Sequence, residues 1–370
     1  MNRRPQKSRS SYDAFSPSHT AHFRASAPDT RFFDARKKRS PGRCALLVLV
    51  CTLSAVLVLN FIANFFVRVE RVNVPVTGLT EAFSDYTVLH ISDLKGESFG
   101  GSQARLTMAL GSAEYDAVVL TGDMVSPLGS AQPFYELIDA LKALRPGTPI
   151  YFIPGDSDPE PASMTYASGG SPFAPWVLGA QQRGAIWLNT PQRVTRGSQT
   201  LWLCTSAQLN LDINTMQPQF EQLYLNALAS HDQNEIELAA YNLHQLEETR
   251  AARSAMNETD VFIALTHVPP LHEELQGAAA SQIDLLLCGH YLGGLMRLPV
   301  AGPVFIPSPQ LPLYGLFPGD AMRCGLTRSG RTAIYVSPGL GSRDELYPPF
   351  FFRLLNPPTV TLITLTPSSL

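Results

Sequence analysis

The sequence of 370 residues contains five cysteines, and none of them forms a Cys-x-x-Cys pair. Cys44 and Cys51 lie inside a long apolar run, which leaves Cys204, Cys288 and Cys324 in the rest of the chain. An odd number of cysteines without paired spacing excludes a disulfide framework. We expect these three thiols to be buried and to pack as small apolar side chains.

Positive charge is scarce beyond residue 43, where 17 basic residues face 28 acidic ones and the net charge is −11. So acidic a region excludes nucleic acid as a partner. The chain also lacks a Gly-x-Ser-x-Gly elbow, which excludes a serine hydrolase of the α/β type. Residues 1–43 instead carry eleven Lys and Arg, lack apolar periodicity, and are predicted to form a disordered basic tail.

Residues 44–67 contain no charged side chain. A helix of about 20 apolar residues spans a bilayer, whereas a cleavable signal peptide has a core of about 7–15 residues. Nothing polar marks a solvent face, which argues against a buried core helix. The sequence therefore predicts one transmembrane helix in the cell membrane, with the basic tail in the cytoplasm and residues 68–370 outside.

Strand-like and helix-like stretches alternate after residues 68–85, which we interpret as a short connector. This alternation predicts an α/β fold with helices outside the sheets. A Pro- and Gly-rich stretch over residues 298–317 is expected to be a loop near the site. Strands are expected at residues 86–92, 117–121, 149–153, 200–205, 261–266, 283–288, 332–336 and 359–365, and helices at 103–114, 133–144, 173–183, 217–230 and 233–256.

Five of the first six strand-like runs are followed by an Asp or a His. One such residue has no special meaning, and a lone His267 would be a structural histidine. A sheet, however, brings successive strand ends to one edge, and mixed carboxylate and imidazole groups suit a divalent metal such as Mn, Fe or Zn. The five residues are Asp93, Asp123, Asp156, His267 and His290.

In these residues the chain resembles the calcineurin-like metallophosphoesterase superfamily, most closely its membrane-anchored bacterial branch. The family motifs Asp-x-His, Gly-Asp-x-x-Asp, Gly-Asn-His-Asp, a single His and Gly-His-x-His-Gly-Gly have counterparts here in the same order. The resemblance implies a four-layer α/β/β/α sandwich over residues 86–366, with residues 217–256 as a helical insertion that is either a lid or an outer layer. These counterparts are Asp93-Leu94-Lys95, Gly122-Asp123-Met124-Val125-Ser126, Gly155-Asp156-Ser157-Asp158, Thr266-His267 and Gly289-His290-Tyr291-Leu292-Gly293-Gly294.

The resemblance also implies a two-metal site, but this chain departs from it at two ligands. Lys95 and Leu292 stand where the family has histidines. Neither can coordinate a metal, because the ammonium of Lys95 has no free lone pair and the side chain of Leu292 has no donor atom. The ligands of the other metal correspond to Asp123, Asp156, His267 and His290. We therefore expect one divalent ion rather than two.

The remaining site residues have open roles. Lys95 is expected to pair with Asp93, either offering a fixed charge to a phosphate oxygen or only neutralising that carboxylate. Asp158 is a further catalytic candidate, and Arg297 is either a substrate contact or an ordinary surface arginine.

Ser157 replaces a histidine that assists the reaction in the family, and losing a positioned proton donor costs about 10²–10⁴ in rate. Two hypotheses result. One is a membrane-anchored phosphoesterase acting on a phosphorylated small molecule or a lipid-like substrate, and the other is a pseudoenzyme that serves as a binding or scaffold module.

Overall fold

The computed structural model describes residues 41–125, 130–270, 282–298, 302–306, 316–318, 324–342 and 353–368. The predicted disordered tail lies outside the described residues, except that residues 41–43 begin a helix. The chain divides into two compact units, residues 1–54 and 55–370, which are described separately.

Helix α1 (Pro41–Phe65) is long and apolar enough to cross a membrane, because 25 residues at about 1.5 Å each exceed the thickness of a hydrocarbon core. Its large apolar side chains are exposed, including Leu46, Leu53 and Phe61. This agrees with the predicted apolar helix. One residue of α1, Asn60, is buried, and its contacts are taken up below.

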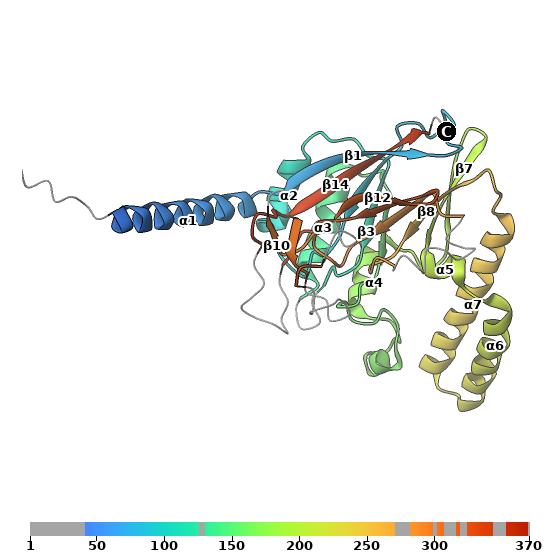
Figure 1. The fold of residues 1–370 in the computed structure, drawn as a ribbon. Helices are drawn as coiled ribbons and strands as arrows, with labels where there is room; N and C mark the ends of the chain where they lie inside the picture. Colours follow the sequence, from blue (N-terminus) through green and yellow to red (C-terminus); the bar gives the residue numbers. More distant parts are fainter. Residues whose placement is uncertain are drawn as a thin grey trace, which may run out of the picture. The chain divides into compact units, whose positions relative to one another are not determined.

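Two six-stranded sheets form the centre of the second unit (Figure 1). The first sheet has the order β1-β14-β2-β3-β4-β5 and the second the order β12-β13-β9-β8-β7-β6. The first contains β1 (Arg68–Val76), β2 (Thr87–Ile91), β3 (Ala117–Thr121), β4 (Ile150–Ile153), β5 (Ala185–Trp187) and β14 (Thr359–Pro367). The second contains β6 (Gln192–Arg196), β7 (Gln199–Thr205), β8 (Val261–Leu265), β9 (Leu285–Cys288), β12 (Gly325–Ser329) and β13 (Thr332–Val336).

The expectation of a connector over residues 68–85 is wrong for its first half. Strand β1 pairs in parallel with β14 from Arg68 opposite Thr359 to Val76 opposite Pro367, and it forms an edge of the first sheet. An edge strand has only one strand neighbour, so charged residues can stand at its exposed and half-buried positions, as Arg68, Glu70 and Arg71 do here. These charges break the apolar pattern by which a strand is predicted from sequence.

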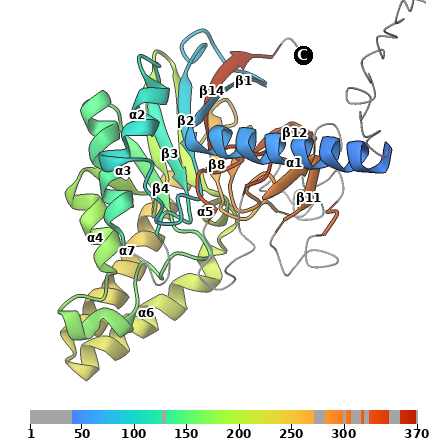
Figure 2. The same ribbon diagram turned by 90° about the vertical axis from the view of Figure 1, so that its left-hand side faces the viewer.

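Apolar side chains fill the space between the two sheets. Val88 and Val119 from the first sheet pack there with Ile263 and Leu287 from the second. The other face of the first sheet packs on α2 (Ala104–Leu110), α3 (Gln132–Leu144) and α4 (Pro175–Gln182), as Figure 2 shows. The outer face of the second sheet packs on Leu209 of α5 (Ser206–Asn210). The predicted α/β sandwich of helix, sheet, sheet and helix is therefore present.

The predicted helical insertion is a pair of helices, α6 (Ile213–Ser230) and α7 (Gln233–Ala255). Asp212 and Asp232 cap their N-termini, and His231 between them adopts a left-handed conformation. Tyr241 of α7 stacks on Trp187, and its hydroxyl accepts a hydrogen bond from Asn189 at 2.9 Å. The prediction of a loop over residues 298–317 is wrong for Gly302–Phe305, which form β11 and pair with β10 (Met296–Leu298). Residues 299–301 and 307–315 of this segment lie outside the described residues.

His90 lies on β2 in the interior and interacts with the hydroxyl of Thr121 at 2.8 Å. Burial lowers the pKa of His90 from 6.5 to about 3. The folded state thus keeps this ring neutral, while the unfolded chain protonates it below pH 6.5. The contribution of neutral His90 to the unfolding free energy is therefore fully present above pH 6.5 and is lost as the pH falls toward 3.

We expect the unfolding free energy of the wild type, with a chelator present, to fall between pH 7 and pH 4 by about 3 kcal/mol more than that of His90→Gln. Urea unfolding at both pH values measures this difference. Equal pH dependence of the two proteins would show that His90 is not the acid-sensitive group.

Candidate metal centre

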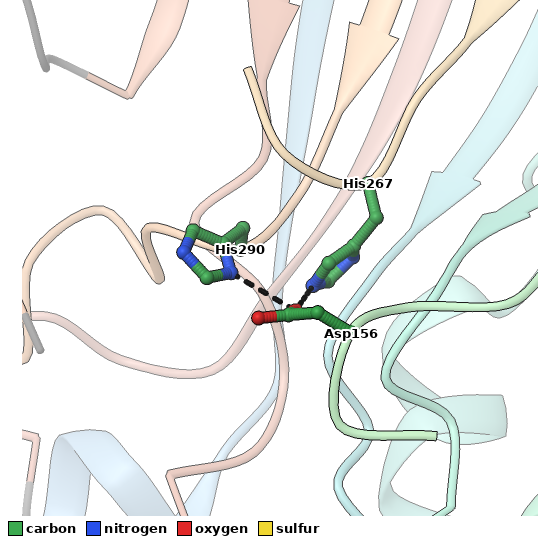
Figure 3. Close-up of side chains that lie close together, drawn as sticks. All are labelled: Asp156, His267 and His290. Carbon is green, nitrogen blue, oxygen red and sulfur yellow. Dashed lines mark hydrogen bonds and ion pairs between the residues drawn. The ribbon is translucent and has the colours of Figure 1, made fainter. Parts of the chain in front are cut away.

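The five predicted residues lie together where strands of both sheets end. Asp93, Asp123 and Asp156 follow β2, β3 and β4 of the first sheet, while His267 and His290 follow β8 and β9 of the second. Parallel pairing of β2, β3 and β4, and of β8 and β9, places these ends at one edge of each sheet. The predicted convergence of these side chains is thus observed, and Figure 3 shows three of them.

His267 is the centre of this cluster. Its Nδ1 lies 2.6 Å from the carbonyl oxygen of Thr121, which can only accept, so Nδ1 carries a proton and donates it. This bond turns Nε2 toward two carboxylates, with Asp156 Oδ1 at 2.9 Å and Asp123 Oδ2 at 3.3 Å. Nδ1 of His290 lies 3.1 Å from the same oxygen of Asp156 (Figure 3).

The donor atoms fit a divalent cation. Oδ1 of Asp93 is buried and has no hydrogen-bond partner among the described residues, and the buried Nε2 of His267 faces the carboxylates of Asp123 and Asp156. The ligand atoms form two overlapping groups, each within 4.8 Å. One group contains Asp156, His267 and His290, the other contains Asp93, Asp123 and His267. Imidazole nitrogens with carboxylate oxygens suit Mn, Fe or Zn.

The charges of these groups depend on one another. Burial by itself raises the pKa of Asp123, but the hydrogen bond with His267 and the charges of His267 and Lys95 outweigh burial and hold that pKa well below its usual range. Burial opposes protonation of His267, yet its hydrogen bonds to Asp123 and Asp156 raise its pKa well above the ordinary value. A proton on Nε2 thus neutralises the carboxylates without a metal, and a bound metal ion replaces it.

Lys95 does not pair with Asp93 as expected. Its Nζ lies 2.7 Å from Oδ2 of Asp123, and only 11% of the Lys95 side chain is exposed. The backbone explains why Lys95 pairs with Asp123. The amide of Lys95 donates to the carbonyl oxygen of Asp123, which holds the turn after β2 against the loop after β3. The ammonium of Lys95 is therefore in contact with Asp123, one of the candidate metal ligands.

Leu292 is the other residue that stands where the resemblance places a metal-binding histidine, and its side chain offers no ligand atom. It is buried, and a Cβ added to Gly339 would lie 3.1 Å both from Leu292 Cδ2 and from Asp93 Cβ. Leu292 and Asp93 therefore pack against the same glycine, where a Cβ would crowd both side chains. An apolar side chain and a lysine thus replace the two missing histidines.

Two other predicted site residues lie outside the metal-ligand groups. Asp158 is buried and accepts hydrogen bonds from the amides of Val125 and Gly155, both at 2.8 Å. Burial raises its pKa to about 6, with a further contribution from the charge of Asp123. This geometry ties two loops together. Arg297, on β10, directs its guanidinium to the sulfur of Cys324.

Close backbone approach explains a glycine of the cluster. A Cβ at Gly155 would overlap Oδ1 of Asp123, the oxygen that accepts the amide of Ser157 at 2.9 Å. Several non-glycine residues here have left-handed backbones, which L-residues rarely adopt. Their φ angles are 55° at Asp93, 51° at Lys95, 55° at Asp123, 69° at His290 and 54° at Leu292.

Two buried residues near Leu292 were not identified as site residues from the sequence. The side-chain amide of Asn356 donates to the carbonyl oxygens of Leu292 and Gly294. Arg353 is 4% exposed, and its guanidinium donates to four backbone carbonyls. Asn356 stands in an Asn-Pro-Pro sequence, whereas Arg353 follows three phenylalanines and gives no sequence signal.

The model of the calcineurin-like phosphoesterase family matches residues 86–293, a range that contains all five residues of the cluster. Among solved structures, the crystal structure of TT1561 of Thermus thermophilus is 12% identical to this chain, with a TM-score of 0.35. The match covers 69% of this chain and 90% of that one. No similar sequence was found among curated proteins.

Proposed function

The chain belongs to the calcineurin-like phosphoesterase family, and from this premise we propose that it hydrolyses a phosphate ester or anhydride with a single divalent ion. Asp156, His267 and His290 would hold the ion, with Asp123 as a further ligand. The observation that carries this proposal is Nε2 of His267, a buried ring nitrogen that faces two carboxylates and is oriented by the hydrogen bond from Nδ1 to the carbonyl oxygen of Thr121.

A divalent ion held by these residues would supply Lewis acidity toward a phosphoryl oxygen and would lower the pKa of a bound water. The protein's own groups do the rest. Asp156 is 49% exposed and marks the open side of the cluster, where a phosphate enters. Lys95 offers its positive charge beside Asp123, and a compact ammonium binds a phosphate oxygen as a point charge. Ser157 offers no proton donor near neutral pH, so we expect slow turnover.

The location of the enzyme is part of the proposal. Helix α1 would anchor the chain in the cell membrane, with the basic tail in the cytoplasm and the phosphoesterase domain outside. An anchored site meets substrates that lie in or near the bilayer. A phosphorylated small molecule or a lipid-like phosphate ester is therefore the substrate class that we propose.

A second candidate function is a metal-binding pseudoenzyme. The ion pair between Lys95 and Asp123 favours it, because the ammonium lies beside an oxygen of Asp123 and would repel a second metal ion there. The replacement of a proton-donating histidine by Ser157 favours it as well. In this case the fold would retain one ion and bind a partner without hydrolysing it.

Hydrolysis by the full-length protein in detergent distinguishes the two candidates. We expect turnover of aryl phosphate monoesters or diesters with added Mn²⁺, and a loss of at least about 100-fold in His290→Ala. His231→Ala, which changes an exposed histidine between α6 and α7, is the matched control and should leave turnover unchanged. Bound metal without turnover above the level of His290→Ala would favour the pseudoenzyme.

A further inference from the structure

Asn60 and Asn64 are polar residues four positions apart in the largely apolar α1, and both belong to the second compact unit. Their Nδ2 atoms donate to the same acceptor, the carbonyl oxygen of Arg353, at 2.9 and 2.8 Å. The Oδ1 atom of Asn60 accepts the amide of Leu355 at 2.7 Å. A polar side chain in an apolar helix is costly unless it is hydrogen-bonded, and here the domain provides the partners.

The end of α1 is held at other points too. Nη1 of Arg105 donates to the carbonyl oxygen of Phe65 at 2.6 Å, and its guanidinium lies 4.6 Å above the Phe65 ring. An arginine at this position satisfies a carbonyl that the helix leaves free at its C-terminus. Val67, two residues later, is buried in the core with α2 and the first sheet. These contacts make the end of α1 part of the folded domain rather than a loose tether.

Arg353 links this helix end to the metal centre. Its guanidinium donates to the carbonyl oxygens of Pro338 and Gly341, at 3.0 and 2.8 Å, and more weakly to Leu292 and Asn356. The loop at residues 338–341 in turn donates to the strand end beside Asp93. The amide of Leu340 donates to Ser92 and that of Gly341 to Asp93, at 3.1 and 2.6 Å.

We propose that Asn60, Asn64 and Arg353 are positioning residues, which hold the loop at residues 338–341 and the backbone of Leu292 against Asp93. The apolar helix then acts on the site as well as anchoring the chain, because its last two turns fix the backbone that supports a carboxylate of the cluster. The positioning role rests on the proposed function only in the kcat measurement, since hydrogen exchange does not require hydrolysis.

The experiment uses the full-length chain in detergent and the variant Asn60→Leu/Asn64→Leu. The control is Thr52→Val, since the Thr52 hydroxyl donates only within the helix, to Val48. We expect the amides of Leu340 and Gly341 to exchange hydrogen about tenfold faster or more in the double variant, and at the wild-type rate in the control. A fall in kcat of about tenfold with an unchanged KM should accompany it.

Arg353→Lys gives an independent test, because it keeps the charge but cannot reach four carbonyl oxygens at once. We expect it to accelerate exchange at the same two amides. Unchanged exchange in the folded double variant overturns the proposal, whether or not the protein hydrolyses phosphate esters. If the double variant does not fold, the single Asn64→Leu, which loses one hydrogen bond, provides the same readout. Absent hydrolysis in the wild type overturns the proposed function alone.

Discussion

Replacing His267 by asparagine is expected to lower both metal affinity and turnover at least about 100-fold. Asparagine retains an N–H that can donate to the carbonyl oxygen of Thr121, as Nδ1 of His267 does. It places no ligand atom at the position of Nε2, which lies within 3.3 Å of both Asp123 and Asp156. The variant therefore removes the ligand but keeps the structural bond.

Isothermal titration with Mn²⁺ and hydrolysis of an aryl phosphate measure the two losses. His244→Asn is the matched control, because it makes the same change at an exposed position of α7 and should leave both values within about twofold of the wild type. Metal binding by His267→Asn at wild-type affinity would mean that Nε2 is not a ligand, and the site would then need to be sought elsewhere.

The second large effect is on stability. Replacing Lys95 by methionine is expected to lower the unfolding free energy of the metal-free protein by about 3–5 kcal/mol, the usual cost of removing one partner of a buried ion pair. Asp123 has a side chain that is 1% exposed, and it would lose its ammonium while the methionine keeps most of the aliphatic volume. Saturating divalent metal should recover part of the loss, because it supplies a new positive charge to the carboxylates.

Urea unfolding with a chelator, repeated with Mn²⁺, measures both parts of this prediction. Glu114→Gln breaks the pair between Arg145 and the 90% exposed Glu114, and should change the unfolding free energy by less than about 1 kcal/mol. A similarly small effect of Lys95→Met would show that Asp123 is already neutralised by His267, and that the lysine is dispensable.

The strand ends could be predicted because their signal is local. An apolar run that stops at Gly-Asp or Thr-His predicts both a strand and the polar residue that follows it. Strand β3, which precedes Asp123, is an example. The order of the motifs along the chain then predicted that residues from both sheets converge on one site. Strand β1 could not be predicted in this way, because it contains charged residues and pairs, among the described strands, with β14 alone, almost 300 residues away.

The partner of Lys95 was wrong for a different reason. A long, flexible side chain has several carboxylates within reach, and its choice depends on the left-handed backbone at residues 93 and 95, which carries no clear sequence signal. Arg353 was missed because its partners are backbone carbonyls, which every residue has. Polar contacts of this kind depend on tertiary structure, and sequence periodicity does not report them.

The metal content of the purified full-length protein tests the central account most directly. After dialysis against Mn²⁺ and removal of free ion, elemental analysis should give about one metal ion per chain, and the value should fall toward zero in His267→Asn. A ratio near two would contradict the account, because it would require a second ion to displace the ammonium of Lys95 from Asp123.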